Sequence, residues 1–203
     1  MKRNPIEVFS QWADLDKDFG MEKNHYKAVE NMLTFTQSKN TPFSFIDAGC
    51  GNGWVVRSLT KNAACNLAIG VDGSKKMIVK AKKIDPKGMY ICADLMSWIP
   101  KEKVDIVHSM EVFYYVENPQ KLIQQIFDKW LKQIGTLVIG LDFYTENTIS
   151  HSWPEDCGIA KMKLFSEKKW VSFFKDAGFS KIKSWRFGTK KDWGGTLIIT
   201  GTK

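Results

Sequence analysis

The chain has 203 residues, of which 43% are hydrophobic and 26% are charged, and its formal net charge is +8. This size and composition predict a single globular domain, residues 1–203, that needs neither a structural metal nor disulfide bonds to bury a core. No apolar run reaches roughly 18 residues and no apolar segment follows the basic N-terminus, so we expect neither a membrane span nor a secretory signal. The four cysteines are far apart and form no CxxC pair, which favours a reducing, cytoplasmic location.

The positive charge comes almost wholly from lysine, because 27 of the 30 basic residues are lysine and three are arginine. Proteins that read nucleic acids favour arginine, whose flat guanidinium binds phosphate and guanine with two hydrogen bonds. Ten basic residues against two acids lie between Lys161 and Lys191. We interpret this excess as a solvated surface and expect no nucleic-acid partner.

Helical and strand patterns alternate in the first half of the chain. The elements expected there are, in order, two helices within 5–38 that break near Phe19-Gly20, a buried strand Phe43–Ala48, a helix from Trp54, a strand Leu67–Val71, a helix from its N-cap Ser74 to about Ile84, and strands Met89–Cys92 and Val104–His108. Strands that alternate with helices predict a parallel sheet with helices on both faces.

The second half repeats the alternation and then departs from it. A helix opens at Pro119 and a strand covers Thr136–Leu141, after which the stretch 142–165 has no clear period. A loop of this length in a compact domain is typical of a lid. Ser166 caps a helix that runs to Ala177 and ends at Gly178, and strands Ile182–Phe187 and Thr196–Thr200 follow without a helix between them.

These elements predict an α/β fold: a doubly wound, mostly parallel seven-stranded sheet, Rossmann-like, that ends in an antiparallel hairpin. Residues 1–40 are expected to form an N-terminal helical cap, and 41–203 the ligand-binding sheet with its lid loop 142–165.

The strongest functional signal is the segment FIDAGCGNGW, residues 45–54, which follows the first strand and opens a helix. Its glycines allow sharp turns and close approach of a ligand. A dinucleotide fingerprint would need glycine where Trp54 stands, and a phosphate-binding P-loop would need Lys-Ser/Thr after the glycines. The carboxylate of Asp47 would repel a pyrophosphate and attract an ammonium group. The loop therefore favours a ligand that carries an amino-acid moiety.

With Asp47, Gly49, Gly51 and Gly53 the sequence resembles the class I S-adenosylmethionine-dependent methyltransferases. The resemblance continues through Asp72 in GVDGSKKMI, through ICADLMSW, and through VDIVHSMEVFYYV, which contains the fourth strand and its end. It implies S-adenosyl-L-methionine as the cofactor, with Asp72 on the ribose and Asp94 on the adenine amino group. Both acids have an alternative role as helix or turn caps.

The resemblance implies a cofactor site that draws on several segments. Its expected members are Trp12, Met21, Asp47, Gly49, Cys50, Gly51, Gly53, Asp72, Gly73, Met77, Ala93, Asp94, Leu95, His108 and Ser109. Cys50 could be read as a nucleophile, but a small spacer between glycines is the preferred interpretation. No metal is expected, because no acidic cluster accompanies Asp142.

Three segments supply candidates for the methyl acceptor. The catalytic candidates are His25, Glu111 and Tyr114, with His25 as base or orienting group or, alternatively, a residue of a helix interface. The substrate-binding candidates are Tyr26, Tyr115, Asp142, Tyr144, His151 and Trp153. The clamp (Asn/Asp)-Pro-Pro-(Tyr/Phe) of enzymes that methylate base or amide nitrogens is absent after the fourth strand, and so is a Pro-Cys nucleophile motif.

We therefore expect a methyltransferase that acts on N, O or S of a small molecule. Two alternatives stay open: a methyltransferase acting on RNA or protein, and a non-catalytic protein that binds the cofactor. The sequence predicts neither the identity of the acceptor nor the oligomeric state.

Overall fold

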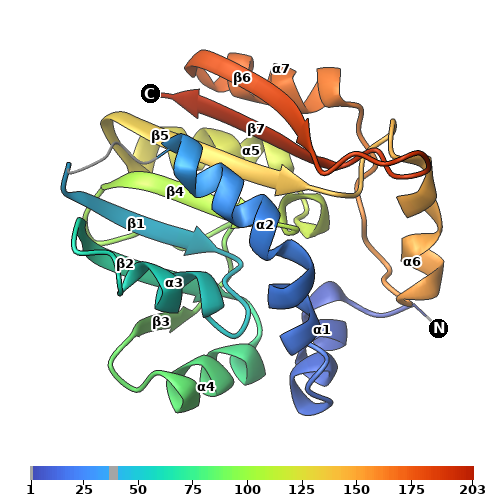
Figure 1. The fold of residues 1–203 in the computed structure, drawn as a ribbon, viewed down its shortest axis with the longest axis horizontal. Helices are drawn as coiled ribbons and strands as arrows, with labels where there is room; N and C mark the ends of the chain where they lie inside the picture. The colour runs from blue at the N-terminus through green and yellow to red at the C-terminus, as the bar shows by residue number, and fades with distance from the viewer. Residues whose placement is uncertain (1, 37–40) are drawn as a thin grey trace.

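A single seven-stranded sheet organises the computed structural model, which describes residues 2–36 and 41–203 (Figure 1). The strand order is β3-β2-β1-β4-β5-β7-β6, and all neighbours are parallel except the pairs that β7 makes with β5 and β6. The strands are β1 Phe43–Ala48, β2 Cys65–Asp72, β3 Met89–Cys92, β4 Val104–Met110, β5 Leu131–Leu141, β6 Ser180–Phe187 and β7 Thr196–Thr202. The predicted fold class, including the final hairpin, is confirmed.

Helices cover both faces of this sheet. The helices are α1 Pro5–Asp14, α2 Phe19–Thr36, α3 Trp54–Leu59, α4 Lys75–Ile84, α5 Pro119–Gln125, α6 Trp153–Asp156 and α7 Glu167–Ala177, with short helical turns at Phe113–Tyr115, Ile126–Trp130 and Thr148–Ser152. Apolar residues of α2, α3 and α4 pack on one face, and those of α5 and α7 pack on the other. Helix α1 lies beside α4, near the carboxyl ends of the strands (Figure 1).

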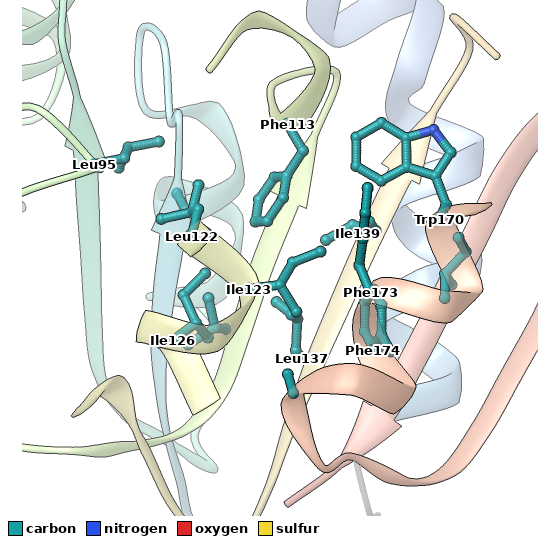
Figure 2. Close-up of a cluster of buried hydrophobic side chains, with 14 of the residues drawn as sticks. Leu95, Phe113, Leu122, Ile123, Ile126, Leu137, Ile139, Trp170, Phe173 and Phe174 are labelled. Carbon is teal, nitrogen blue, oxygen red and sulfur yellow. The ribbon is translucent and has the colours of Figure 1, made fainter. Parts of the chain in front are cut away.

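The larger core forms between α5, α7 and the sheet. Figure 2 shows Ile123 and Phe174 facing Leu137 and Ile139 of β5, all of them fully buried. The side chains alternate along β5, so that Val138 packs with the α2 side instead. Alternate residues of a strand therefore contribute to two hydrophobic cores, one on each face of the sheet.

Local chemistry explains where most helices begin and end. The hydroxyls of Ser74 and Ser166 accept hydrogen bonds from the backbone N–H groups of Met77 and Lys169, as expected for N-caps. Gly178 ends α7 with φ of 95°, a left-handed conformation that favours glycine. Asn4 closes a capping box at the start of α1.

Four strands extend one or two residues beyond their predicted ends, and the structure differs from the predicted boundaries more substantially at three places. The N-terminal helices break at residues 15–18, before Phe19, and the predicted helix end at residue 38 lies outside the described residues. Strand β5 begins at Leu131, because α5 continues as a π-helical turn that leads directly into it. The segment predicted as a lid loop holds two short helical turns, at Thr148–Ser152 and Trp153–Asp156.

Replacing Phe174 by alanine should destabilise the fold strongly. Its ring is fully buried and lies 5.1 Å from that of Phe179. Deleting a buried aromatic side chain typically costs about 3–5 kcal/mol, and we expect that loss in the free energy of unfolding measured by urea denaturation. The control is Ile149→Ala, at a side chain that is 53% exposed, where the change should stay within about 0.5 kcal/mol. Equal losses in the two variants would contradict the core described above.

Candidate functional site

The carboxyl ends of β1, β2 and β4 meet at one edge of the sheet and carry acidic residues there. Asp47 stands opposite His108 in the β1–β4 register, and Asp72 ends β2. Helix α1 lies over this edge and encloses a cavity of about 290 Å³. The lining includes Ile6, Phe9, Met21, Gly49, Gly51, Asp72, Gly73, Met77, Ala93, Asp94, Leu95, Met110, Glu111, Tyr115, Glu117 and Lys161. We call it the main cavity.

The glycine loop shapes one wall of the main cavity. Gly49 and Gly51 have φ of 83° and 53°, in the left-handed region. A β-carbon at Gly49 would overlap the Val112 side chain at 2.2 Å, whereas one at Gly51 would meet no atom within 4 Å. Gly51 therefore leaves open a space that a ligand can fill, as the cofactor implied by the sequence resemblance requires.

Asp72 joins the glycine loop to the next helix. Its carboxylate accepts hydrogen bonds from the backbone N–H groups of Gly51, at 2.9 Å, and Ser74, at 2.7 Å. Burial raises the pKa of Asp72, and the two N–H donors oppose that shift. Asp72 is thus both a cap and a residue of the cavity wall.

The far end of the main cavity is an apolar slot beside an exposed acid. Met77 and Leu95 are buried and line it together with Ala93. Asp94 accepts a hydrogen bond from the backbone N–H of Met96 at 2.9 Å, so its predicted alternative as a turn cap is present while it also lines the cavity. A flat, weakly polar ring such as adenine fits this set of side chains.

A second, small cavity of about 30 Å³ adjoins the main one on the side of α2. Both are lined by Met21, Gly49, Gly51, Met110 and Glu111, and the small cavity adds Asp18, His25, Asp47, Cys50, Asn52, Trp54, Val55 and His108. Within it Nδ1 of His108 lies 2.8 Å from Oδ1 of Asp47.

Glu111 is held in a strained conformation where the two cavities meet. Its φ is 61°, rare for a non-glycine residue, and its N–H donates to the carbonyl of Gly140 at 2.9 Å. Its carboxylate accepts hydrogen bonds from the Tyr114 hydroxyl, at 2.5 Å, and from the backbone N–H of Asp142. Burial, and secondarily the charge of Asp142, raise the pKa of Glu111 well above its usual value.

His25 on α2 approaches this cluster. Its Nδ1 is 3.7 Å from Oδ2 of Asp142, too far for a hydrogen bond. Burial lowers the pKa of His25 to about 4 and raises the pKa of Asp142 to about 6. At neutral pH the imidazole is therefore uncharged, and it can accept a hydrogen bond from a ligand.

Cys50 lies in the loop without the features of a nucleophile. Its side chain is buried, and burial together with the charges of Asp72 and Asp47 raises the pKa of its thiol well above the usual value. A β-carbon at Gly70 would lie 2.7 Å from its sulfur. Its environment agrees with the interpretation of Cys50 as a small spacer.

Several residues predicted for the site lie outside the linings of both cavities. Trp12 packs edge-on against Phe9, Gly53 is the N-cap of α3, and the Ser109 hydroxyl donates to the carbonyl of Ala48. Tyr26 is exposed, with its hydroxyl 3.4 Å from Glu30.

The predicted substrate-binding residues of the segment 142–165, Asp142, Tyr144, His151 and Trp153, line neither cavity. The Tyr144 hydroxyl donates to the carbonyls of Gly194 and Gly195, the His151 ring lies 3.1 Å from the Thr145 carbonyl, and Trp153 stacks on Trp193. Tyr114 is buried behind Glu111, whereas Tyr115 lines the main cavity. From the segment 142–165, Lys161 is the residue found in a lining.

Sequence reasoning predicted an N-terminal helical cap and named Trp12 of α1, but it missed the α1 residues that line the main cavity. Ile6 and Phe9 line the main cavity, and Phe9 contacts Tyr115 with ring centroids 5.1 Å apart. The Ser10 hydroxyl lies 2.8 Å from that of Ser74, and Arg3 forms a parallel bridge with Ile159. The capping box that begins at Asn4 is the sequence signal for α1, but it predicts only where the helix starts and not which residues the helix packs against.

The described residues offer neither a metal centre nor a membrane-spanning helix. No group of three or more His, Cys, Asp or Glu side chains is placed to hold a metal ion within residues 2–36 and 41–203. In the same part of the chain no helix is both long and apolar enough to cross a lipid bilayer.

Comparison with known families gives one match over most of the chain. Residues 21–184 match a family model described as a methyltransferase domain. Trans-aconitate 2-methyltransferase from Agrobacterium fabrum is 31% identical over 93 residues, which are 46% of this chain and 36% of the relative. Malonyl-acyl-carrier-protein O-methyltransferase from Halalkalibacterium halodurans is 30% identical over 108 residues, which are 50% and 40% of the two chains. The chain spans about two fifths of the length of these curated relatives.

A solved structure matches over the full length. The complex between the Haloferax volcanii Trm112 methyltransferase activator and a methyltransferase contains a chain that superposes with a TM-score of 0.82. The two chains are 26% identical, and the match covers 100% of this chain and 99% of that one.

The shifted pKa of Asp142 predicts a pH-dependent gain in stability for Asp142→Asn. The unfolded chain releases this proton near its ordinary pKa of 3.8, while the folded chain holds it to about 6, so the folded state is penalised once pH exceeds both. We expect the variant to unfold with a free energy up to about 3 kcal/mol higher than wild type at pH 8, and the gain to fall by about half at pH 5.

Urea denaturation at the two pH values measures this difference. Asp192→Asn, at an exposed acid, serves as the control and should show no such gain. An Asp142→Asn effect that is the same at both pH values would exclude a buried, penalised charge.

Proposed function

Because this chain belongs to the class I S-adenosylmethionine-dependent methyltransferases, we propose that it transfers a methyl group from S-adenosylmethionine to a small-molecule acceptor. The observation that carries the proposal is the main cavity, where the glycine loop, Asp72 and the slot at Leu95 meet under α1. When bound, the cofactor supplies an activated methyl group on a sulfonium centre. The residues of the chain then have to bind the cofactor and the acceptor, orient them toward each other and exclude water.

The ionisable lining favours an acceptor that attacks through an amine or a hydroxyl rather than a carboxylate. Among the described residues that line the two cavities, Lys161 is the one Lys or Arg, and it is ion-paired with Glu117. Asp47, Asp72 and Glu111 line the same space. A carboxylate acceptor would meet these acids without a free cation to offset them. The two curated relatives above are named for a carboxylic acid and a malonyl group, so the acceptor proposed here differs from theirs.

Two side chains can interact with the N–H or O–H proton of such an acceptor, one by removing it and one by accepting its hydrogen bond. Burial raises the pKa of Glu111, which makes its carboxylate a stronger base. The uncharged imidazole of His25 is too weak a base to compete, but it can orient an N–H or O–H by accepting its hydrogen bond. We assign Glu111 to proton removal and His25 to orientation.

The position of the lysine-rich segment supports a small acceptor over RNA. Most of its basic residues lie on α7 and β6, at the edge of the sheet opposite to β3, whereas the main cavity lies at the ends of β1, β2 and β4 (Figure 1). The four cysteines are free thiols, which supports the proposed cytoplasmic location.

A panel of acceptors tests the proposed function. With S-adenosylmethionine present, we expect S-adenosylhomocysteine to form with small amines or alcohols and not with trans-aconitate or a malonyl thioester. His25→Leu should lower kcat/KM for the acceptor about 10- to 100-fold, while Lys27→Gln, an exposed neighbour on α2, leaves it unchanged. Faster turnover of a carboxylate than of any amine or alcohol would contradict the acceptor class, and absence of turnover with every acceptor would favour a non-catalytic role.

We propose in addition that the protein works with an activator protein bound along β3. The full-length similarity to the chain solved with the Trm112 activator supports such a partner. Strand β3 is an edge of the sheet and contains no charged residue, and Met89 on it is 49% exposed. Ile84, at the end of the neighbouring helix α4, is 42% exposed.

The opposite edge of the sheet, unlike β3, is protected against pairing with another strand. Strand β6 carries the exposed basic residues Lys181, Lys183 and Arg186 and an irregular register between Ser180 and Lys183, features that oppose the addition of another strand. Around β3, the exposed Lys82 and Lys83 form no ion pair with a described residue. An acidic surface beside an extended strand would complement this edge.

Substitution at the β3 edge tests the activator site. Met89→Glu combined with Ile84→Glu should weaken binding of the Trm112-type activator of the source organism at least about 10-fold in a titration, because it buries charge at an apolar contact. Ile149→Glu, at another exposed isoleucine, should bind as the wild type does. If the double variant binds as the wild type does, the activator does not contact β3. If the wild type does not bind the activator, the proposal of an activator is wrong.

A further inference from the structure

Asp18, in the turn between α1 and α2, is a buried carboxylate that the proposed chemistry does not use. Its side chain is 1% exposed. Oδ1 accepts a hydrogen bond from the ammonium of Lys80 on α4 at 2.6 Å, and Oδ2 accepts one from the side-chain amide of Asn52 in the glycine loop at 2.7 Å. A buried carboxylate is destabilising unless such partners surround it. The contacts of Asp18 therefore hold three elements together.

Lys80 draws the whole turn between the two N-terminal helices toward α4. Its ammonium also donates to the carbonyl of Ala13 at 3.2 Å and to the carboxylate of Asp16 at 2.6 Å, and it lies 4.4 Å from the centre of the Phe19 ring. The side chain of Asp16 is 72% exposed, in contrast to that of Asp18. Exposed ion pairs contribute little, whereas breaking a buried one is costly. Two carboxylates on one lysine therefore differ in their expected importance.

Asp18 begins the face of α2 that lines the two cavities. Its carbonyl accepts a hydrogen bond from the N–H of Met21 at 3.1 Å. Asp18, Met21 and His25 follow one another at spacings of three and four residues, which places them on one side of a helix. All three line the small cavity, and so does Asn52. The hydrogen bond between Asp18 and Asn52 therefore joins the helix that carries His25 to the glycine loop.

We propose that Asp18 is a positioning residue for methyl transfer, which holds His25 in register with the glycine loop through its hydrogen bond to Asn52. The proposal rests on the proposed function, because it takes the glycine loop as part of the cofactor site and His25 as a group that orients the acceptor. Methyl transfer needs the acceptor and the sulfonium aligned, and a displacement of about 1 Å can lower the rate about 100-fold. A direct bond between the two binding elements sets that alignment.

The experiment exchanges the two partners of this hydrogen bond. Lys80 and Asn52 donate to different oxygens of Asp18, so the amide of Asp18→Asn turns its oxygen to one donor and its N–H₂ group to the other. Asn52→Asp places two carboxylates against each other. The double variant, Asp18→Asn with Asn52→Asp, restores one donor and one acceptor to the contact. Its new carboxylate lies beside Arg57, whose Nη2 is 3.4 Å from Oδ1 of Asn52.

Asp16→Asn is the matched control. It removes the exposed partner of the same lysine, and asparagine tolerates the positive φ of 56° at this position. Isothermal titration with S-adenosylhomocysteine reports on the glycine loop. The NMR signal of the His25 ring, assigned with His25→Leu, reports on α2 and needs no ligand, and the spectrum is simple because the chain has three histidines. Urea denaturation measures the loss of stability separately.

We expect Asp18→Asn and Asn52→Asp each to bind S-adenosylhomocysteine about 10-fold more weakly than wild type and to shift the His25 signal. The double variant should recover binding to within about threefold of wild type and return the His25 signal toward its original position. Asp16→Asn should match wild type within about twofold. If Asn52→Asp does not fold, the recovery of Asp18→Asn by the second substitution carries the same test.

Three outcomes would overturn the assignment. Losses that add in the double variant mean that the contact does not couple α2 to the glycine loop. A lower free energy of unfolding with unchanged ligand binding and an unchanged His25 signal means that Asp18 only supports the fold. Effects of the same size in Asp16→Asn mean that Lys80, and not Asp18, sets the position. If wild type binds neither S-adenosylhomocysteine nor S-adenosylmethionine, the proposed function fails, which the ligand-free His25 signal distinguishes from these three results.

Discussion

The arrangement of this protein depends on carboxylates that a parallel sheet forces together. Strands β1, β2 and β4 run in the same direction, so Asp47, Asp72 and Glu111 reach one edge of the sheet. Backbone N–H groups donate to two of these acids: those of Gly51 and Ser74 to Asp72, and that of Asp142 to Glu111. These donors offset part of the negative charge, and a cationic ligand is the natural complement for the rest.

Glu111 also belongs to a second group of ionisable residues, with Asp142 and His25, that lies next to these acids. Glu111 keeps its strained backbone because hydrogen bonds to Tyr114, Gly140 and Asp142 hold it from three sides. The raised pKa of Glu111 and the lowered pKa of His25 share their largest cause, which is the burial of both side chains. The burial that shifts both pKa values also limits the access of water, as a methyl-transfer site requires.

Much of the fold could be read from the sequence, because strand periodicity, Ser74, Ser166 and Gly178 are local signals. The glycine loop and Asp72 were predictable for the same reason, since a strand followed by glycines and a helix has few geometries. Residues of the predicted lid, such as Tyr144 and His151, depend on which way a long irregular segment turns, and no local pattern fixes that. The N-terminal cap was predictable, but the lining of the cavity by Ile6 and Phe9 depends on tertiary contacts between distant segments, which one sequence does not specify.

The buried acids also tie ligand occupancy to the stability of the whole molecule. Charge held in a cavity without a counter-charge weakens the native state relative to the unfolded chain, where water solvates each carboxylate. A cation that enters the cavity binds the native state alone and shifts the unfolding equilibrium by mass action, by about 2.7 kcal/mol at a hundredfold excess over Kd. A rise in the melting temperature of this protein would therefore report the binding of a cation between Asp47, Asp72 and Glu111. It would also report ligands that bind there without being converted to a product.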